Sequence, residues 1–164
     1  MTVTCDLFTL AVSISPRDRQ LRFSLRTDLP CGTIVILDCR RHYEDFDHER
    51  CVWTMFSEKL VVDRTSDGDL NGVDGVLDVD EGDRKALRRF GETTDGFSAG
   101  ILGPIEEAIE VSAMVGARQR LRIFGANNQA LEGASVTRRG PVKVVEAIAE
   151  AAIPMAPDFQ PISE

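Results

Sequence analysis

Apolar and polar residues alternate along residues 8–14 and 21–26, and this alternation predicts two β-strands. Successive side chains of a strand point to opposite faces, so each of these strands has one buried face and one solvent-facing side. The β-branched and aliphatic run 33–39 is typical of a strand buried on both faces. Residues 51–56 and 60–62 are also strand-like. Short strands at this spacing predict a mainly β fold, either an antiparallel sandwich or a barrel.

Two later segments fit two periodicities. Residues 104–116 begin with a proline and two glutamates, as a helix does, yet their apolar residues also alternate as in a strand. Residues 141–153 are rich in alanine but show the same alternation. Between them, residues 121–124 are predicted to form a strand. We expect one domain over residues 1–153, followed by a C-terminal extension over 154–164.

The composition is typical of a soluble globular protein, and the net charge indicates which classes of partner to expect. The chain has 164 residues, with 19 basic and 27 acidic side chains and a formal net charge of −8. Proteins that bind nucleic acid usually carry the opposite sign, so we expect no nucleic-acid partner. No apolar run approaches the length of a membrane span, and the N-terminus lacks the pattern of a secretory signal. We therefore expect a cytoplasmic protein with no membrane partner and with reduced cysteines.

Acidic residues concentrate in one stretch. Residues 63–83 contain eight acidic side chains and one basic side chain, and they are rich in glycine. A basic segment, 84–91, follows and is predicted to form a short helix that Asp80 or Asp83 would cap. The interpretation is an acidic loop and short-helix insertion over about 63–91, placed between strands.

The first candidate metal site is Cys39-x2-His42-x5-His48-x2-Cys51. Thiolates and imidazoles are the ligands of structural zinc, and a hairpin centred near Asp45 would bring the two pairs together. Alternatives are a Cys39–Cys51 disulfide, a catalytic cysteine–histidine pair, or ordinary core cysteines beside solvated histidines.

The second candidate is a calcium loop. Asp63, Asp67, Asn71 and Asp74 occupy ligand positions of the twelve-residue calcium-loop pattern, with Gly68 at the turn. The pattern departs at Thr65 and at the final position, which is an aspartate where glutamate is usual. The alternative is a solvated acidic loop.

The chain shows no phosphate-binding glycine motif, and no catalytic residues are assigned. Four arginines could form a basic strip on one sheet face, although a solvated face is the simpler interpretation: Arg22, Arg26, Arg40 and Arg41.

The turn at residues 27–33, Thr-Asp-Leu-Pro-Cys-Gly-Thr, resembles a group of bacterial immunoglobulin-like β-sandwich domains. Segment 95–100 resembles a strand start of that group, and segment 122–133 resembles its last hairpin. The resemblance implies an immunoglobulin-like antiparallel β-sandwich, favours strands for both ambiguous segments and implies no activity.

These observations predict a non-enzymatic binding or structural module that meets a protein partner or a second copy of itself. A calcium- or zinc-stabilised interaction domain is the first alternative. A hydrolase whose site the sequence does not locate is the second.

Overall fold

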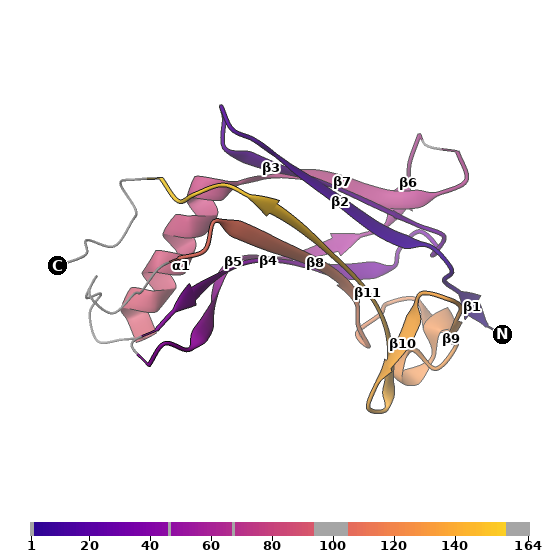
Figure 1. The fold of residues 1–164 in the computed structure, drawn as a ribbon. Coiled ribbons are helices and arrows are strands. Elements are labelled where there is room, and N and C mark those ends of the chain that lie inside the picture. The colour runs from indigo at the N-terminus through magenta and orange to yellow at the C-terminus, as the bar shows by residue number, and fades with distance from the viewer. Residues whose placement is uncertain (1, 46, 67, 94–104, 157–164) are drawn as a thin grey trace.

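The computed structural model describes residues 2–45, 47–66, 68–93 and 105–156. Over these residues the protein is mainly β, with several antiparallel sheets and a helix. The elements form two layers of strands, with the helix lying across one end (Figure 1).

The larger layer is a five-stranded antiparallel sheet with the strand order β10-β11-β8-β4-β5. Its strands are β4 (Ile34–Glu44), β5 (Arg50–Val61), β8 (Ala108–Val115), β10 (Val136–Arg139) and β11 (Val142–Ala152). Strands β4 and β5 form a hairpin whose turn includes Asp45, the hairpin that the zinc hypothesis required.

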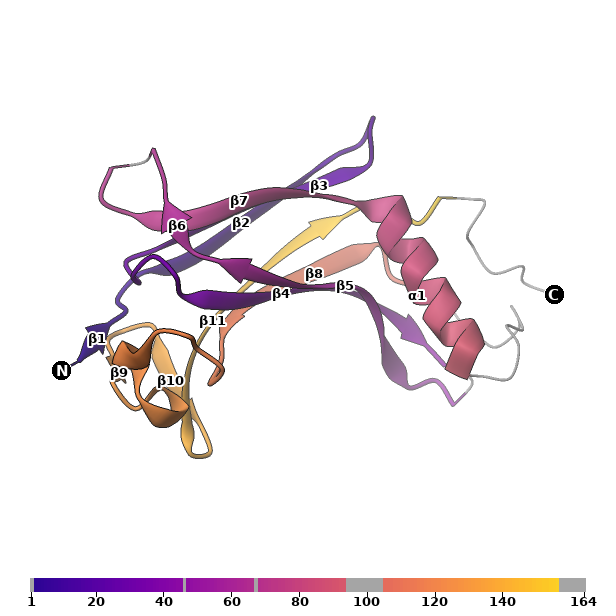
Figure 2. The ribbon, with the colours of Figure 1, turned by 180° about the vertical axis from the view of Figure 1, so that it is seen from behind.

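The smaller layer is a four-stranded antiparallel sheet with the order β2-β3-β7-β6. Its strands are β2 (Phe8–Ser15), β3 (Gln20–Thr27), β6 (Asp63–Arg64) and β7 (Asn71–Asp78). Near the N-terminus, β1 (Val3–Thr4) pairs in parallel with β9 (Leu131–Glu132). Seen from behind, β6 and the β9–β10 region lie at the end of the molecule opposite the helix (Figure 2).

Buried side chains from both sheets and from the helix form one hydrophobic core. Leu21, Phe23 and Leu25 of β3 contribute from the smaller sheet, whereas Leu37 of β4 and Val111 of β8 contribute from the larger. Alternate residues of each strand therefore point inward, and the intervening residues of the larger sheet form its outer face.

The helix α1 (Val79–Thr93) follows β7 directly. The Asp78 carboxylate accepts the backbone N–H of Glu81 at 3.0 Å, so Asp78 caps the helix in place of the predicted Asp80 or Asp83. The helix begins at residue 79, earlier than the predicted 84, and it continues through Gly91.

The predicted acidic loop contains a strand of the sheet. β7 pairs with β3 over eight residues, from Gln20–Asp78 to Thr27–Asn71. Its aspartates Asp74 and Asp78 are exposed, whereas Val73 and Leu77 pack against the core. The alternation was hidden because Gly75 occupies an inward position, where a Cβ atom would lie 2.5 Å from the Phe23 ring.

Both ambiguous segments are strands. β8 and β11 pair over eight residues, with Val145 opposite Val115 and Ala152 opposite Ala108. Their apolar alternation matches the sheet, and their helix-forming composition is overridden by burial of one face.

The predicted strand at 121–124 is wrong, because residues Arg122–Phe124 form the 3₁₀ turn η2. A second such turn, η3 (Ala126–Asn128), follows it. Asn127 and Asn128 have φ of 54° and 57°, a conformation that asparagine tolerates better than most residues and that no strand adopts. Phe124 is fully buried and anchors these turns.

Packing also extends beyond residue 153, where the domain was expected to end. Ile153 and Met155 are 7% and 5% exposed. The segment 95–100 that resembled a strand start, and residues 157–164, lie outside the described residues.

Candidate binding surface

A row of side chains crosses the outer face of the larger sheet from β11 to the edge strand β5. The strand registers place Glu146 of β11 opposite Met114 of β8, Met114 opposite Ile36 of β4, and Ile36 opposite Lys59 of β5. In the next row, Ile34 lies opposite Val61, whose side chain is 51% exposed. The middle of these rows is therefore apolar, whereas charged side chains, Glu146 and Lys59, stand at the ends of the first row.

A cavity of about 440 Å³ opens over these rows. Ile34, Ile36 and Met114 form its apolar lining, Lys59 lies on the β5 side, and residues 116–119 follow the end of β8. We call this cavity the outer groove.

The Gln119 side chain fixes the loop that bounds the outer groove. Its amide oxygen accepts the Ile34 backbone N–H at 2.8 Å, and its amide nitrogen donates to the Ile34 carbonyl at 2.8 Å. The side-chain amide thereby makes the two hydrogen bonds that a neighbouring strand would make to the first residue of β4. These bonds hold the loop after β8 against the sheet.

Two cationic side chains border the outer groove without an ion-pair partner among the described residues: Lys59 and Arg118, both exposed. A third cation, Arg139 on β10, pairs with Glu146 at 2.9 Å and lies 3.6 Å from the Met114 sulfur. The apolar floor is therefore bordered by positive charge.

The same outer face becomes polar toward α1. The Arg40 guanidinium donates to the Ser112 hydroxyl at 3.0 Å, and the His42 imidazole lies 3.8 Å from the Glu110 carboxylate.

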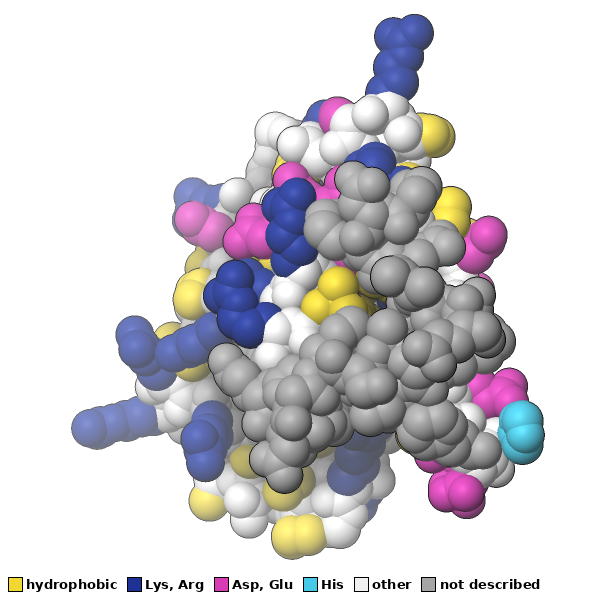
Figure 3. Space-filling view, turned by 90° about the vertical axis from the view of Figure 1, so that its left-hand side faces the viewer, with side chains coloured by type: hydrophobic (Ala, Val, Ile, Leu, Met, Phe, Trp, Pro, Cys, Tyr) yellow, Lys and Arg dark blue, Asp and Glu magenta, His cyan; other side chains and the backbone are white. Residues whose placement is uncertain are grey.

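Seen from the helix end, lysine and arginine side chains gather toward one edge of the molecule, whereas a histidine and nearby carboxylates stand at the other (Figure 3).

Comparisons with protein-family models, with curated proteins and with solved structures found no match to this chain. Among the described residues, no helix is both long and apolar enough to cross a membrane.

The structure does not bring the four zinc candidates together. Cys39 is buried in the core and burial raises its pKa to about 12, whereas His42 lies on the outer face of the same strand. His48 is exposed in the hairpin turn against Glu44, and the Cys51 thiol lies 3.5 Å from an Asp45 oxygen. One ion bound by all four would require a side chain of β4 to pass through the sheet, so the zinc site stays a prediction with this geometry against it. Cys39 and Cys51 are free thiols, so the alternative disulfide is absent.

The calcium candidates are engaged in the hairpin formed by β6 and β7. The Asp74 carboxylate binds Arg26 at 2.6 Å, which lowers the pKa of Asp74, and the Asn71 amide donates to the Leu29 carbonyl at 2.9 Å. Asp63 accepts the neighbouring Arg64 N–H, and Asp67 lies outside the described residues. Among the described residues, no group of three or more potential metal ligands gathers. Calcium binding also stays a prediction.

The four arginines do not form the basic strip that the sequence allowed, and the favoured interpretation, a solvated face, is wrong for Arg41. Arg22 and Arg26 belong to the smaller sheet, Arg40 belongs to the outer face of the larger one, and Arg41 is fully buried. The Arg41 guanidinium binds the equally buried Asp83 carboxylate through two hydrogen bonds of 3.0 and 3.2 Å. No sequence signal distinguished Arg41 from Arg40, except that strand alternation from Cys39 places residue 41 on the core side.

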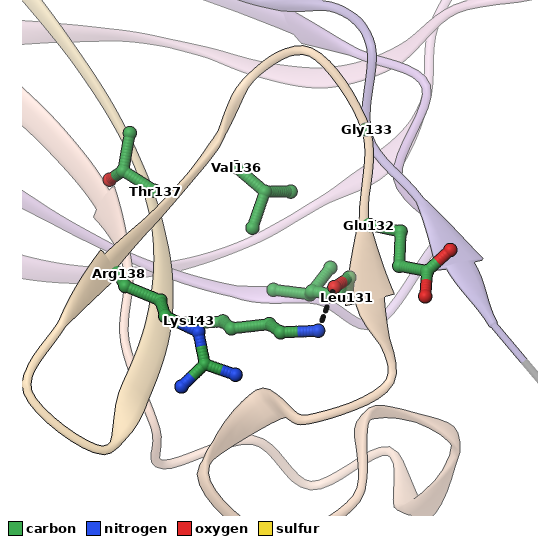
Figure 4. Close-up of a pocket in the computed structure, with 7 residues that line it drawn as sticks. All are labelled: Leu131, Glu132, Gly133, Val136, Thr137, Arg138 and Lys143. Carbon is green, nitrogen blue, oxygen red and sulfur yellow. Dashed lines mark hydrogen bonds between the residues drawn. The ribbon is translucent and has the colours of Figure 1, made fainter.

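Two further cavities are less suited to a ligand. One, of about 300 Å³, lies beside the β10–β11 hairpin, with the Leu131 and Val136 side chains in it (Figure 4). Its Lys143 amine is occupied by the carbonyls of Leu131 and Gln129, both at 2.9 Å. The other, of about 320 Å³, lies at the β4–β5 turn, where Arg50 and Glu106 already pair at 2.8 Å.

Proposed function

We propose that the protein is a non-enzymatic interaction module that binds a partner protein on the outer face of its larger sheet. The observation that carries this proposal is the outer groove, whose apolar lining comes from outward-pointing side chains of two adjacent strands, the half-buried Ile36 and Met114 and the 7% exposed Ile34. Concave apolar surface with polar groups at its border is typical of binding sites. Exposed apolar surface of this kind lowers solubility unless a partner covers it.

The arrangement of two facing antiparallel sheets supports, as part of this proposal, the immunoglobulin-like resemblance of the 27–33 turn. Domains of this kind present sheet faces and loops to partners. Such a scaffold suits a module whose function is contact. The calcium- or zinc-stabilised domain and the hydrolase stay alternatives without a supporting contact among the described residues.

A matched pair of substitutions tests the proposed surface. Val61 and Val76 are 51% and 48% exposed, but Val61 borders the outer groove and Val76 lies on the smaller sheet. Val61→Glu introduces a charge at the groove, and Val76→Glu introduces the same charge elsewhere. Neither is expected to unfold the protein, because both side chains are solvent-exposed.

The experiment uses the full chain as bait in extracts of the cells that make it, followed by titration with the purified partner. We expect Val61→Glu to weaken binding of that partner about tenfold or more, whereas Val76→Glu leaves it unchanged. If no partner distinguishes Val61→Glu from wild type, the outer face is not the binding surface.

A further inference from the structure

We propose that the outer groove binds a partner segment in which apolar side chains are flanked by carboxylates. This inference rests on the proposed function and specifies the chemistry of the partner. It follows from the combination of an apolar floor with unpaired cations at its border.

The floor selects aliphatic side chains. Ile34, Ile36 and Met114 come from two adjacent central strands and present no hydrogen-bonding side-chain group except the weakly accepting Met114 sulfur. Binding there therefore depends on apolar area removed from water. Methionine also adapts its shape to different side chains, which suits a groove that receives a flexible segment.

The border selects acidic side chains. Lys59 stands on edge strand β5, and Arg118 stands beyond the end of β8. Neither has an ion-pair partner among the described residues, so both are available to a ligand. A carboxylate placed beside either would gain a charge-assisted hydrogen bond next to the apolar contact.

The surrounding chain reinforces this selection. Residues 117–145 contain six basic side chains and one acidic side chain, in a protein whose net charge is −8. Arg118, Arg120, Arg122 and Arg138 in this stretch are all exposed. The local field therefore attracts an acidic segment toward a molecule that would otherwise repel it.

A peptide segment fits these features better than a nucleic acid does. Single-stranded nucleic acids bind through aromatic side chains on which bases stack, along a track of positive charge. The outer groove has an aliphatic floor, and no aromatic side chain lines it in the part of the chain that the structure describes. An extended or helical peptide supplies both the apolar and the acidic groups in one segment.

The test measures binding of three fluorescein-labelled synthetic peptides of about ten residues to the full chain by fluorescence anisotropy. One peptide alternates leucine with glutamate, one alternates leucine with lysine, and one alternates serine with glutamate. The proteins are wild type, the double charge reversal Lys59→Glu/Arg118→Glu, and the control reversal Arg17→Glu/Arg22→Glu. The control changes the same net charge at exposed positions outside the larger sheet.

We expect wild type to bind the leucine–glutamate peptide about tenfold more tightly than either other peptide. Lys59→Glu/Arg118→Glu should reverse the preference toward the leucine–lysine peptide, and Arg17→Glu/Arg22→Glu should leave it unchanged. If the peptide preference changes in Lys59→Glu/Arg118→Glu and not in Arg17→Glu/Arg22→Glu, the groove determines the selectivity and the overall charge does not.

Other outcomes overturn the inference in distinguishable ways. If wild type binds both leucine peptides equally, or binds neither while Val61→Glu still abolishes binding of a natural partner, the acidic preference is wrong and the proposed function stands. If sedimentation shows a dimer that Val61→Glu dissociates, a second copy of the chain occupies the groove. If the control reversal acts like the groove reversal, binding is non-specific electrostatic attraction and not a groove interaction.

Discussion

At the residue scale, the buried Arg41 side chain joins several segments that are distant in the chain. Its guanidinium pairs with Asp83 on α1, and it also donates to the carbonyls of Glu107 before β8, at 2.8 Å, and of Ile153 after β11. The planar guanidinium suits this arrangement because it offers five N–H groups in fixed directions. Burial raises the pKa of Asp83, and the guanidinium beside it acts in the opposite direction.

Arg41→Met should destabilise the protein by about 3–5 kcal/mol, because it leaves the Asp83 carboxylate buried without its partner. The double variant Arg41→Met/Asp83→Leu should recover part of this loss. It should not recover all of it, since the Ile153 carbonyl still loses its Arg41 donor and the Glu107 carbonyl keeps only the Ile153 N–H, at 3.0 Å. Urea unfolding followed by circular dichroism measures both changes. A loss below about 1 kcal/mol for Arg41→Met would show that water reaches this pair.

The sequence could not identify this pair. Arg40 and Arg41 are adjacent arginines in a polar segment, and composition alone favours a solvated face for both. Their difference arises because β4 alternates about the sheet, which places Arg41 toward α1 and Arg40 toward Ser112. The partner Asp83 is 42 residues away in the chain and lies in an acidic stretch that was predicted to be a loop up to residue 83.

At the scale of elements, the strands were predictable where apolar alternation was uninterrupted. β2 and β3 match the predicted runs, whereas β7 was missed because Gly75 interrupts its apolar inward positions and because aspartates occupy outward ones. The outer groove was missed for a related reason. Ile34 and Ile36 lie in a run that reads as buried on both faces, and the register with β5 and β8 shows which side chains of the neighbouring strands share their outer face.

The packing of α1 on β5 depends on Gly82. A Cβ atom there would lie 2.5 Å from the Phe56 ring and 3.0 Å from the Met55 Cβ, at the irregularity where β5 has one more residue than β4. Glycine therefore allows the helix backbone to approach the strand closely.

Gly82→Ala should destabilise the protein by about 1–3 kcal/mol through overpacking, although alanine favours a helix by about 1 kcal/mol. Adding Phe56→Leu should relieve part of the loss by removing the ring. Gly116→Ala is the control, because its nearest contact would be an ordinary 3.8 Å to the Met114 side chain. Thermal unfolding compares the variants. An increase in stability for Gly82→Ala would mean that the helix shifts away from β5 without cost.

At the scale of the whole molecule, acidic and basic side chains are separated along the chain and only partly paired. Local pairs such as Arg26–Asp74 and Arg19–Asp80 neutralise part of the acidic stretch, whereas residues 117–145 keep an excess of positive charge. The net charge of −8, from which we expected no nucleic-acid partner, therefore conceals a basic region beside the outer groove. A chain-wide sum cannot report such a separation, because it depends on which segments the fold brings together.

The four free thiols differ in their exposure to solvent. Cys5 and Cys39 are buried, and burial raises the pKa of each to about 12. Cys31 is exposed, and Cys51 is half-buried with its pKa raised by desolvation and by Asp45.

Because the thiolate is the reactive form, a disulfide reagent at pH 8 should modify Cys31 fast, Cys51 more slowly, and Cys5 and Cys39 only upon unfolding. Mass spectrometry of the labelled protein, with Cys31→Ser as the control, measures this order. The order should be the same with and without a chelator, because the Cys39 thiol faces the core and not His42. If Cys39 is labelled fast only after chelation, a metal ion binds this cysteine, and the result supports the zinc hypothesis.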